Sequence, residues 1–349
     1  MSQKINYLDR NEFNFEPAPE VEDVIKNFDV KKLCFYTRVF GEGKKSIFSE
    51  YLSSEYGLDE KQVLLGYGGE DILKQAVHFF LTEEDGNKTM LIPAYSWWYY
   101  RSIANEVNGK SLMYPMYEDG HTFRYDVEAL RKMVLKEQPK IVLLASPNNP
   151  TGNMLTVSEL EDTLTFMPSA SVVLIDEAYA SFITADNSYI NRLINTYPNV
   201  ILTRTLSKFY GLPGLRLGFG FMSAPLERFM KYSTKYLGYN RLSEEIGIAA
   251  LKAKDYYQNV ADSMNLDRRL YEEELGALPG FKVYKSSANF ILVKYPLGLK
   301  GALAKELEEG DCKIKFMDEP ELSGYARITI GTHEQNRQVI RAIKKATNR

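Results

Sequence analysis

Several kinds of residue that build common sites are scarce in this sequence of 349 residues. Its two cysteines, Cys34 and Cys312, lie far apart without metal-ligand spacing, so neither a cysteine metal site nor a disulfide is indicated. The three histidines are scattered, which argues against a histidine metal centre. No apolar run approaches the roughly 18 residues that span a bilayer, and residues 1–6 lack the apolar core of a signal peptide. We therefore expect a cytoplasmic protein with no metal site and no membrane partner.

An excess of charge of one sign is also lacking. The formal net charge is −3, and 26% of the residues are charged against 44% that are hydrophobic. These values are typical of a soluble globular protein and give no electrostatic reason to expect nucleic acid as a partner. The length allows two domains, or one large α/β domain with a smaller lobe.

Between about residues 60 and 222, short apolar runs alternate with helical patterns. Strands are expected at Ile141–Ala145, Val172–Ile175 and Val200–Thr203, because these runs are apolar on both faces. Helices are expected at residues 126–134 and 158–167. This alternation predicts an α/β protein with a mainly parallel sheet that is covered by helices.

The C-terminal third has a different pattern, which predicts a smaller α+β domain. Helices are expected at 242–274, 303–308 and 334–345, and strands at 281–284, 289–293 and 326–330. Residues 1–40 show no clear periodicity and are expected to pack on the small domain or on a partner subunit. We therefore predict a large domain at 41–240 and a small domain at 241–349.

Three polar side chains follow the predicted buried strands, namely Asn149, Asp176 and Lys208. Ligands of open α/β sheets gather at the carboxyl ends of the strands, so these side chains could converge on one ligand. A buried Asp176 needs a partner for its charge, and a protonated pyridine nitrogen would supply one. The Lys208 amine could condense with an aldehyde. This combination predicts pyridoxal 5′-phosphate as the cofactor, held in the large domain.

Donors for a cofactor phosphate are also present. Gly69 and Glu70 precede an apolar helix, so their backbone N–H groups could face an anion. Thr205, Ser207 and Arg216 add two hydroxyl groups and a fixed cation near Lys208. We predict that these five residues bind the phosphate.

Other side chains could contact the cofactor ring. Tyr179 and Asn149 could bond to its phenolic oxygen. Tyr95 could stack on the ring face, but a role as an aromatic core residue is equally compatible with the crowded aromatic segment around it. Both interpretations of Tyr95 remain open.

Four segments resemble the motifs of the fold type I pyridoxal-phosphate aminotransferases, within them the histidinol-phosphate aminotransferase branch. They are Ser146–Gly152, Asp176–Tyr179, Thr205–Lys208 with Arg216, and Ala326–Thr332. The resemblance covers most of the chain. It implies the fold of these transferases, with a mainly parallel large domain and a smaller α+β domain.

The resemblance also implies roles for individual residues. Lys208 would carry the cofactor aldehyde, Asp176 would pair with the ring nitrogen, and Tyr179 would complete the catalytic set. Arg327 would hold the substrate carboxylate in a two-pronged contact, although a salt bridge within the small domain is the alternative. Tyr36 matches a tyrosine that reaches the cofactor phosphate of the neighbouring subunit, so a homodimer is implied.

The chain departs from the family pattern in three places. Asn11-Glu12-Phe13-Asn14 replaces Asn-Glu-Asn-Pro, Gly69-Glu70 replaces Ser-Asp, and Gly238-Tyr239-Asn240-Arg241 replaces a Pro-aromatic-Asn-Val pattern. The first and third regions lie near the substrate side, so the amino donor is left open. Arg241 could bind a phosphate or second carboxylate of the substrate, or be a solvated charge at a helix end.

We expect transfer of an amino group from an amino acid, or an amino-acid-like phosphate, to a 2-oxo acid. Histidinol phosphate and 2-oxoglutarate are the first pair expected. A decarboxylase of amino-acid phosphates, such as threonine phosphate, would keep the same cofactor residues and is the alternative. A non-enzymatic ligand-sensing domain would need an added DNA-binding module, for which we see no spare segment or basic stretch.

Overall fold

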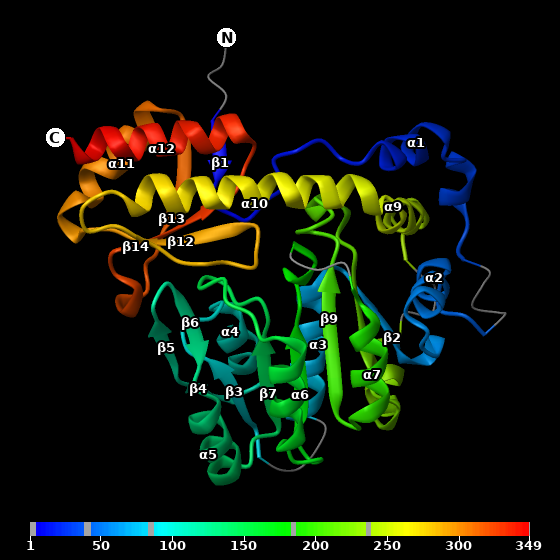
Figure 1. Cartoon of the computed structure of the whole chain (residues 1–349). Coiled ribbons are helices and arrows are strands. Elements are labelled where there is room, and N and C mark those ends of the chain that lie inside the picture. Colours follow the sequence, from blue (N-terminus) through cyan, green and yellow to red (C-terminus); the bar gives the residue numbers. More distant parts are fainter. Residues whose placement is uncertain (1–4, 38–42, 83–86, 183–185, 235–238, 349) are drawn as a thin grey trace.

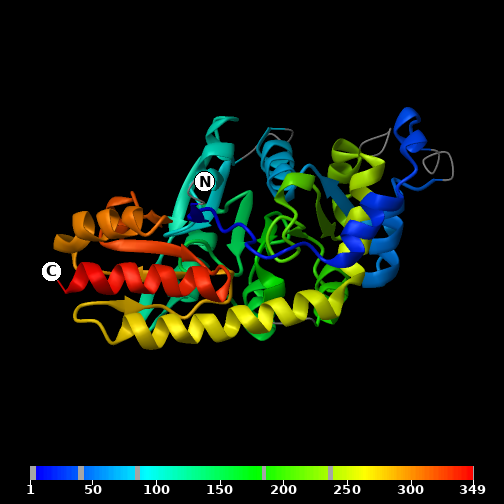
Figure 2. The ribbon, with the colours of Figure 1, turned by 90° about the horizontal axis from the view of Figure 1, so that it is seen from above.

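The computed structural model describes residues 5–37, 43–82, 87–182, 186–234 and 239–348. Figure 1 shows a larger part built on a twisted sheet and a smaller part that contains both ends of the chain. The long helix α10 (Lys254–Gly276) runs along the molecule from one part toward the other, as the view from above shows (Figure 2). Among the described residues, none of the helices is both long enough and apolar enough to cross a membrane.

Within the described ranges, seven strands form the large sheet. In spatial order they are β2 (Val63–Gly66), β10 (Gly218–Met222), β9 (Val200–Thr205), β8 (Val172–Asp176), β7 (Ile141–Ala145), β3 (Thr89–Pro93) and β4 (Lys110–Tyr114). The strand pairs from β9 through β4 are parallel, whereas β10 is antiparallel to both β2 and β9. The predicted α/β class with a mainly parallel sheet is therefore confirmed.

Helices cover both faces of this sheet. Val173 and Ile175 enter one hydrophobic cluster, and Val172 and Leu174 enter another, because successive side chains of a strand point to opposite faces. The first cluster includes α2 (Ile47–Tyr56), α5 (Val127–Glu137), α6 (Val157–Thr165) and α7 (Ser188–Thr196), and the second includes α3 (Gly69–Thr82), α4 (Tyr99–Asn105) and α8 (Glu227–Ser233). With both faces covered, the strand ends are the positions at which side chains of this sheet can reach a ligand.

The C-terminal residues and one N-terminal strand form a second sheet. Its spatial order is β1 (Asn6–Leu8), β13 (Cys312–Phe316), β14 (Tyr325–Thr329), β12 (Phe290–Lys294) and β11 (Lys282–Val283). Side chains of α10, α11 (Lys300–Glu309) and α12 (His333–Thr347) pack with it in one hydrophobic cluster. Strand β13 was not expected from the sequence, although residues 312–316 alternate apolar and lysine side chains, the pattern of a half-buried strand.

The N-terminal segment contains regular structure that its sequence did not reveal. Strand β1 pairs in parallel with β13, and α1 (Pro19–Asn27) packs on α9 (Arg241–Lys252) through Val21 and Ala250. Between these elements the chain crosses the molecule, so residues 9–14 lie beside the junction of the two sheets (Figure 2).

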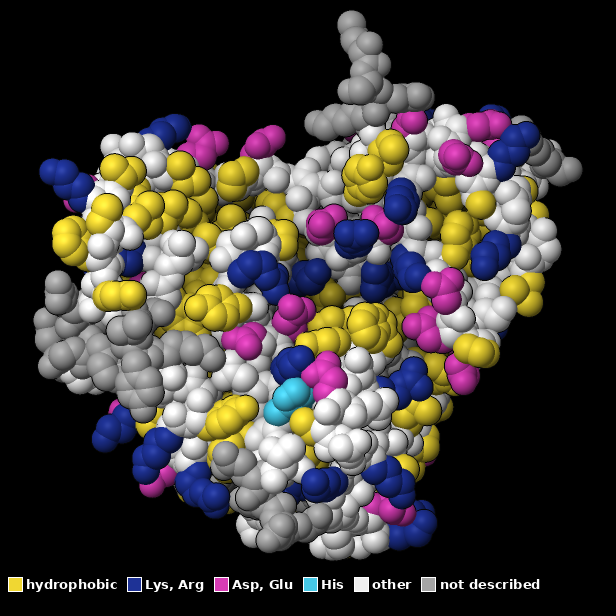
Figure 3. All heavy atoms as spheres, turned by 180° about the vertical axis from the view of Figure 1, so that it is seen from behind, with side chains coloured by type: hydrophobic (Ala, Val, Ile, Leu, Met, Phe, Trp, Pro, Cys, Tyr) yellow, Lys and Arg dark blue, Asp and Glu magenta, His cyan; other side chains and the backbone are white. Residues whose placement is uncertain are grey.

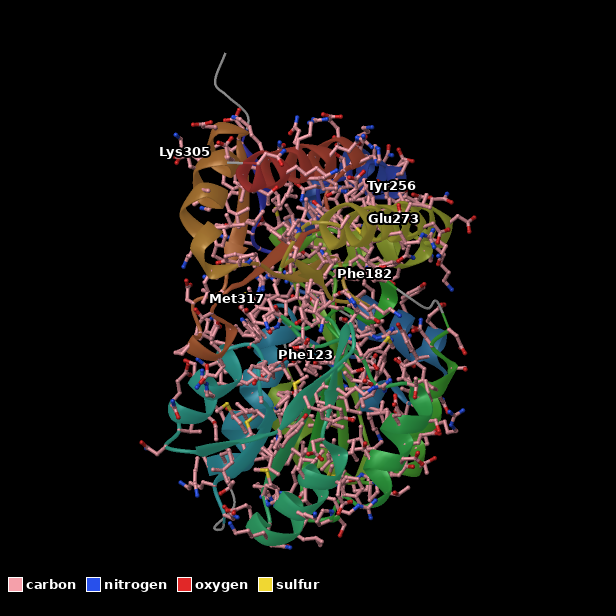
Figure 4. The ribbon with its side chains drawn as sticks, turned by 60° about the vertical axis from the view of Figure 1, so that its left-hand side comes forward. Phe123, Phe182, Tyr256, Glu273, Lys305 and Met317 are labelled. Carbon is pink, nitrogen blue, oxygen red and sulfur yellow. The ribbon has the colours of Figure 1, made fainter. Side chains whose placement is uncertain are left out.

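A hairpin links the two parts of the molecule. Strands β5 (Met116–Asp119) and β6 (Thr122–Tyr125) pair with each other, and the Lys285 N–H donates to the His121 carbonyl oxygen at 2.7 Å. The ring of Phe123, labelled in Figure 4, lies 5.0 Å from that of Tyr284, centroid to centroid. These contacts hold the small sheet over the strand ends of the large one.

Candidate active site

A cavity of about 380 Å³ lies at the carboxyl ends of β7, β8 and β9. Its volume falls in the range of about 300–1,000 Å³ that is usual for small-molecule sites. Side chains of the smaller part also line it, including Arg327 of β14 and Met317, which Figure 4 labels at the junction of the two parts. Figure 3 shows basic side chains, with acidic ones among them, gathered across the middle of one face between these parts.

Asp176 is the last residue of β8 and is only 6% exposed. Its carboxylate accepts hydrogen bonds from the Tyr100 hydroxyl at 2.6 Å and from the Ala178 N–H at 3.0 Å. Burial raises the pKa of Asp176, and the hydrogen bond from Tyr100 opposes that rise. A cation in the cavity would therefore stabilise the charged form of this carboxylate.

Lys208 reaches the same cavity from the segment that follows β9. Its Nζ donates to the main-chain oxygens of Arg10 and Asn11, at 3.2 Å each, and lies 5.8 Å from the centroid of the Tyr179 ring. These partners hold the amine at the cavity without forming a carboxylate ion pair. The arrangement suits an amine that must react with an aldehyde.

One end of the cavity has the features of an anion site. Gly69 begins helix α3, and the first N–H groups of a helix have no partner within the helix, so they favour an anion. Thr205 and Ser207 lie at the same end, with 2.9 Å between their hydroxyl oxygens. The structure thus brings three of the residues that were predicted to bind a phosphate to one end of the cavity.

Arg216 completes this end. Its Nη2 lies 3.1 Å from Glu70 Oε1 and 3.3 Å from the Tyr67 carbonyl oxygen. Gly68 has φ +87°, and a Cβ at this position would lie only 2.6 Å from Arg216 Nη2. Glycine at 68 therefore allows the guanidinium to reach the N-terminus of α3.

Tyr179, Asn149 and Arg327 line the other side of the cavity. Arg327 Nη1 donates to Asn149 Oδ1 at 2.7 Å and Nη2 donates to the Asp9 carbonyl oxygen at 2.7 Å, whereas Nε has no partner among the described residues. These are neutral partners, so the salt bridge considered from the sequence is not what holds this arginine. Burial lowers the pKa of Arg327, which an anionic ligand would counteract.

Three predicted site residues are not among those that line this cavity. Tyr95 is partly buried, its ring packs 5.8 Å from that of Phe123, and its neighbours Ser96, Trp97 and Trp98 line the cavity instead. Tyr36 is 69% exposed on the surface. Arg241 begins helix α9, where Asn240 caps the helix. The roles given to these three residues remain predictions.

The sequence analysis missed a buried ion pair beneath the cavity. Arg204 Nε and Nη2 donate to Glu177 Oε2 at 2.9 and 2.8 Å, and both side chains are about 5% exposed. Burial opposes the charge of Arg204, but the Glu177 carboxylate outweighs this effect and raises the pKa of Arg204 well above its usual value. An arginine within a strand that begins with an apolar run was the available signal, because a buried arginine requires such a partner.

The N-terminal segment also contributes residues that the analysis did not assign. Arg10 and Asn11 line the cavity, together with Lys315 of β13. Asn11 stands at the start of the segment that departs from the family pattern, but only the folded chain brings it beside Tyr179 and Lys208.

These residues fit pyridoxal phosphate. Asp176 offers a buried carboxylate for a cationic ring nitrogen, Lys208 offers an amine, and the N-terminus of α3 with Arg216 offers an anion site. The fold and this set of side chains define a pyridoxal-phosphate-dependent enzyme of fold type I.

The chain belongs to the aminotransferase class I and II family, whose model matches residues 7–343, and it is an aminotransferase. It is 31% identical to histidinol-phosphate aminotransferase 2 of Archaeoglobus fulgidus over 97% of this chain and 92% of that one. It is also 31% identical to histidinol-phosphate aminotransferase of Ruminiclostridium cellulolyticum over 94% and 89% of the two chains.

Solved structures share the fold. The crystal structure of histidinol-phosphate aminotransferase from Sinorhizobium meliloti in complex with pyridoxal-5′-phosphate matches with a TM-score of 0.85 at 23% identity, covering 99% of this chain and 92% of that one. L-threonine-O-3-phosphate decarboxylase from Porphyromonas gingivalis matches with a TM-score of 0.78 at 21% identity, covering 99% and 100%. The fold is thus shared by both reaction types that the sequence analysis considered.

Proposed function

We propose that this enzyme transfers the amino group of histidinol phosphate to 2-oxoglutarate. The observation that carries the proposal is the similarity, over nearly the whole chain, to curated histidinol-phosphate aminotransferases. The cavity supports it, because Arg10, Lys315 and Arg327 line the side opposite the proposed cofactor phosphate and could attract an anionic group of the donor.

Pyridoxal phosphate supplies an aldehyde that takes up the amino group and a ring that accepts the electrons of the Cα–H bond. Asp176 would hold a positive charge on the ring nitrogen, because a buried carboxylate is stabilised by a cation. Lys208 Nζ would take the proton from the substrate carbon that bears the amino group and would deliver the same proton to the former aldehyde carbon of the cofactor. Tyr179 and Asn149 would orient the cofactor through its ring oxygen.

Arg327 meets both substrates in turn. Histidinol phosphate carries a phosphate and no carboxylate, whereas 2-oxoglutarate carries two carboxylates. A guanidinium can donate two parallel hydrogen bonds to either kind of anion, so one residue can serve both. The buried Nε of Arg327 has no hydrogen-bond partner among the described residues, so the protein leaves one donor of this guanidinium unused.

A homodimer is part of the proposal. The segment around the short helix η1 (Val30–Cys34) exposes apolar side chains, with Leu33 55%, Phe35 60% and Tyr36 69% exposed. A cluster of exposed apolar side chains is typical of an interaction surface. Tyr36 would then reach the cofactor phosphate of the partner subunit. Light scattering that finds a fully active monomer would exclude this arrangement.

A cytoplasmic location is also proposed. It is supported by the two unpaired cysteines, of which Cys34 is exposed, because exposed free thiols are usual in a reducing compartment. Fractionation of the source cells with an antibody against the protein would test the location.

The deciding experiment measures glutamate formed from 2-oxoglutarate with histidinol phosphate as the donor. We expect turnover with histidinol phosphate and much less with histidinol, which lacks the phosphate. Carbon dioxide released from threonine phosphate, without glutamate formation, would support the decarboxylase instead. If histidinol phosphate is inert while another amino acid forms glutamate, the proposed donor is wrong.

A matched pair of lysines tests whether the side of the cavity opposite the proposed cofactor phosphate binds the phosphate of the donor. Lys315 lines the cavity and forms an ion pair with Asp318, whereas Lys313 on the same strand does not line it and has its Nζ 3.7 Å from Asp9 Oδ2. Lys315→Gln should raise KM for histidinol phosphate by about tenfold, which corresponds to about 1.4 kcal/mol of lost contact with the phosphate. Lys313→Gln should leave KM unchanged. If both changes raise KM equally, Lys315 does not contact the phosphate and contributes only to the overall positive charge near the cavity.

A further inference from the structure

Asn11 is a buried polar residue beside the cavity whose backbone and side chain both form hydrogen bonds. It is 1% exposed and has φ +56°, a left-handed conformation that few residues other than glycine adopt. Asparagine tolerates this conformation better than most residues. The chain therefore places a specific polar residue, in a specific backbone conformation, at the wall of the active site.

The neighbours of Asn11 fix both its backbone and its side chain. Its N–H donates to Thr329 Oγ1 at 2.9 Å, and Thr329 Oγ1 donates to Asn11 Oδ1 at 3.4 Å. Its carbonyl oxygen accepts hydrogen bonds from Lys208 Nζ at 3.2 Å and from Asn289 Nδ2 at 3.1 Å. Asn11 is thus anchored to the small sheet while it contacts the lysine of the site.

The side-chain amide of Asn11 has one remaining contact. Its Nδ2 donates to the Tyr179 hydroxyl oxygen at 3.0 Å. A tyrosine hydroxyl has a single hydrogen, and an oxygen that accepts an N–H must direct its own hydrogen elsewhere. Tyr179 lines the cavity, so its hydrogen is left to be donated to a group in the cavity.

We propose that Asn11 is a positioning residue that makes the Tyr179 hydroxyl a hydrogen-bond donor toward the cofactor's ring oxygen. This inference rests on the proposed role of Tyr179 but not on the identity of the amino donor. Its test is therefore made without substrate, by measuring the Kd of pyridoxal phosphate and the absorbance spectrum of the bound cofactor at several pH values. A failure of histidinol phosphate as a substrate would leave the result of this test unaffected.

Two variants separate positioning from packing. Asn11→Gly removes the amide but permits the positive φ, whereas Asn11→Asp keeps the shape and replaces the N–H donor by an acceptor. With Asp at this position, the Tyr179 hydrogen turns toward the new carboxylate and away from the cavity. We expect either variant, and Tyr179→Phe, to raise the Kd of pyridoxal phosphate about tenfold, the effect of one lost hydrogen bond to a charged group. Asn11→Asp should also move the pH midpoint of the cofactor's absorbance change in the same direction as Tyr179→Phe.

A double-mutant cycle gives the decisive comparison. If Asn11 acts through the Tyr179 hydroxyl, then Asn11→Gly in the Tyr179→Phe background should change Kd by less than about twofold. Asn14 is the matched control, because its amide donates to the Glu12 carbonyl oxygen within the same segment and does not touch Tyr179. Asn14→Ala should bind the cofactor like the parent. Additive effects of Asn11→Gly and Tyr179→Phe, or a parental Kd and spectrum for Asn11→Asp, would overturn the proposal.

Discussion

Neutralising Glu177 should destabilise the protein far more than neutralising a surface glutamate. Glu177 Oε2 accepts two hydrogen bonds from Arg204, and Oε1 accepts one from the Tyr189 hydroxyl at 2.6 Å. Glu177→Gln preserves the shape of the side chain but leaves Arg204 charged and about 5% exposed. Removing one partner of a buried ion pair typically costs about 3–5 kcal/mol, because the remaining charge is uncompensated.

This loss can be converted to a melting temperature. Unfolding entropy is about 2.1 cal/mol/K for each residue, so a chain of this length gains about 0.7 kcal/mol/K on unfolding. A loss of about 3–5 kcal/mol therefore lowers Tm by about 4–7 °C. The assay is calorimetry of the cofactor-free protein, supported by urea unfolding at 25 °C.

The chain provides a control for the effect of burial. Arg192 Nε donates to Glu161 Oε1 at 2.7 Å, but these side chains are 55% and 31% exposed. Exposed pairs of this kind contribute about 0.2–1 kcal/mol, so Glu161→Gln should lower Tm by no more than about 1.4 °C. If Glu177→Gln is no more destabilising than Glu161→Gln, the argument from burial is refuted.

Three further changes test separate features. Lys208→Ala should change the Tm of the cofactor-free protein by less than about 1 °C, because the partners of Lys208 are main-chain oxygens near solvent. The same change should abolish turnover, and borohydride should no longer attach the cofactor at this position. Gly68→Ala should weaken pyridoxal phosphate binding by about tenfold or more by displacing Arg216, whereas Gly120→Ala, also at positive φ but in open space, should not change that Kd. Burial raises the pKa of Glu244 to about 6. Above that pH the buried carboxylate is charged, and this charge lowers the free energy of unfolding. The loss of stability disappears below about pH 4.3, because there the side chain is protonated in the unfolded chain as well as in the folded one. Glu244→Gln should accordingly raise the free energy of unfolding by about 2 kcal/mol at pH 7, and the gain should shrink as the pH falls from 6 to 4.5 in a urea titration.

The large sheet could be predicted because its strands are buried on both faces. The apolar runs that became β7, β8 and β9 contain no solvent-facing position, and this pattern is typical of a parallel sheet. Strand β13 carried a usable signal, because Lys313 and Lys315 alternate with apolar residues as in a half-buried strand, but its five residues were not assigned. Strand β1 was missed because it spans only three residues and depends on its partner β13.

Residues of the candidate site could be predicted where they end a strand or come soon after one. Asp176 and Lys208 fall into this class, because their positions are fixed by the end of one element. Asn11 does not, since its contact with Tyr179 joins residues 168 positions apart in the chain. Tyr100 gave no signal of its own among the aromatic residues around it, and only the fold brings its hydroxyl to Asp176.

The charges around the cavity differ in how they are compensated, and this difference indicates where ligands bind. Arg204 and Glu177 satisfy each other, so this pair needs nothing from outside the protein. Asp176 is buried and has a raised pKa, and its contacts are hydrogen-bond donors that carry no positive charge. Arg327 is buried and has a lowered pKa, and its Nε has no partner among the described residues. A cationic ring nitrogen at Asp176 and an anionic substrate group at Arg327 would each relieve one of these penalties. On this proposal, binding energy is available at the two positions between which Lys208 would act, and ligand binding would return the stability that the protein gives up at these buried charges.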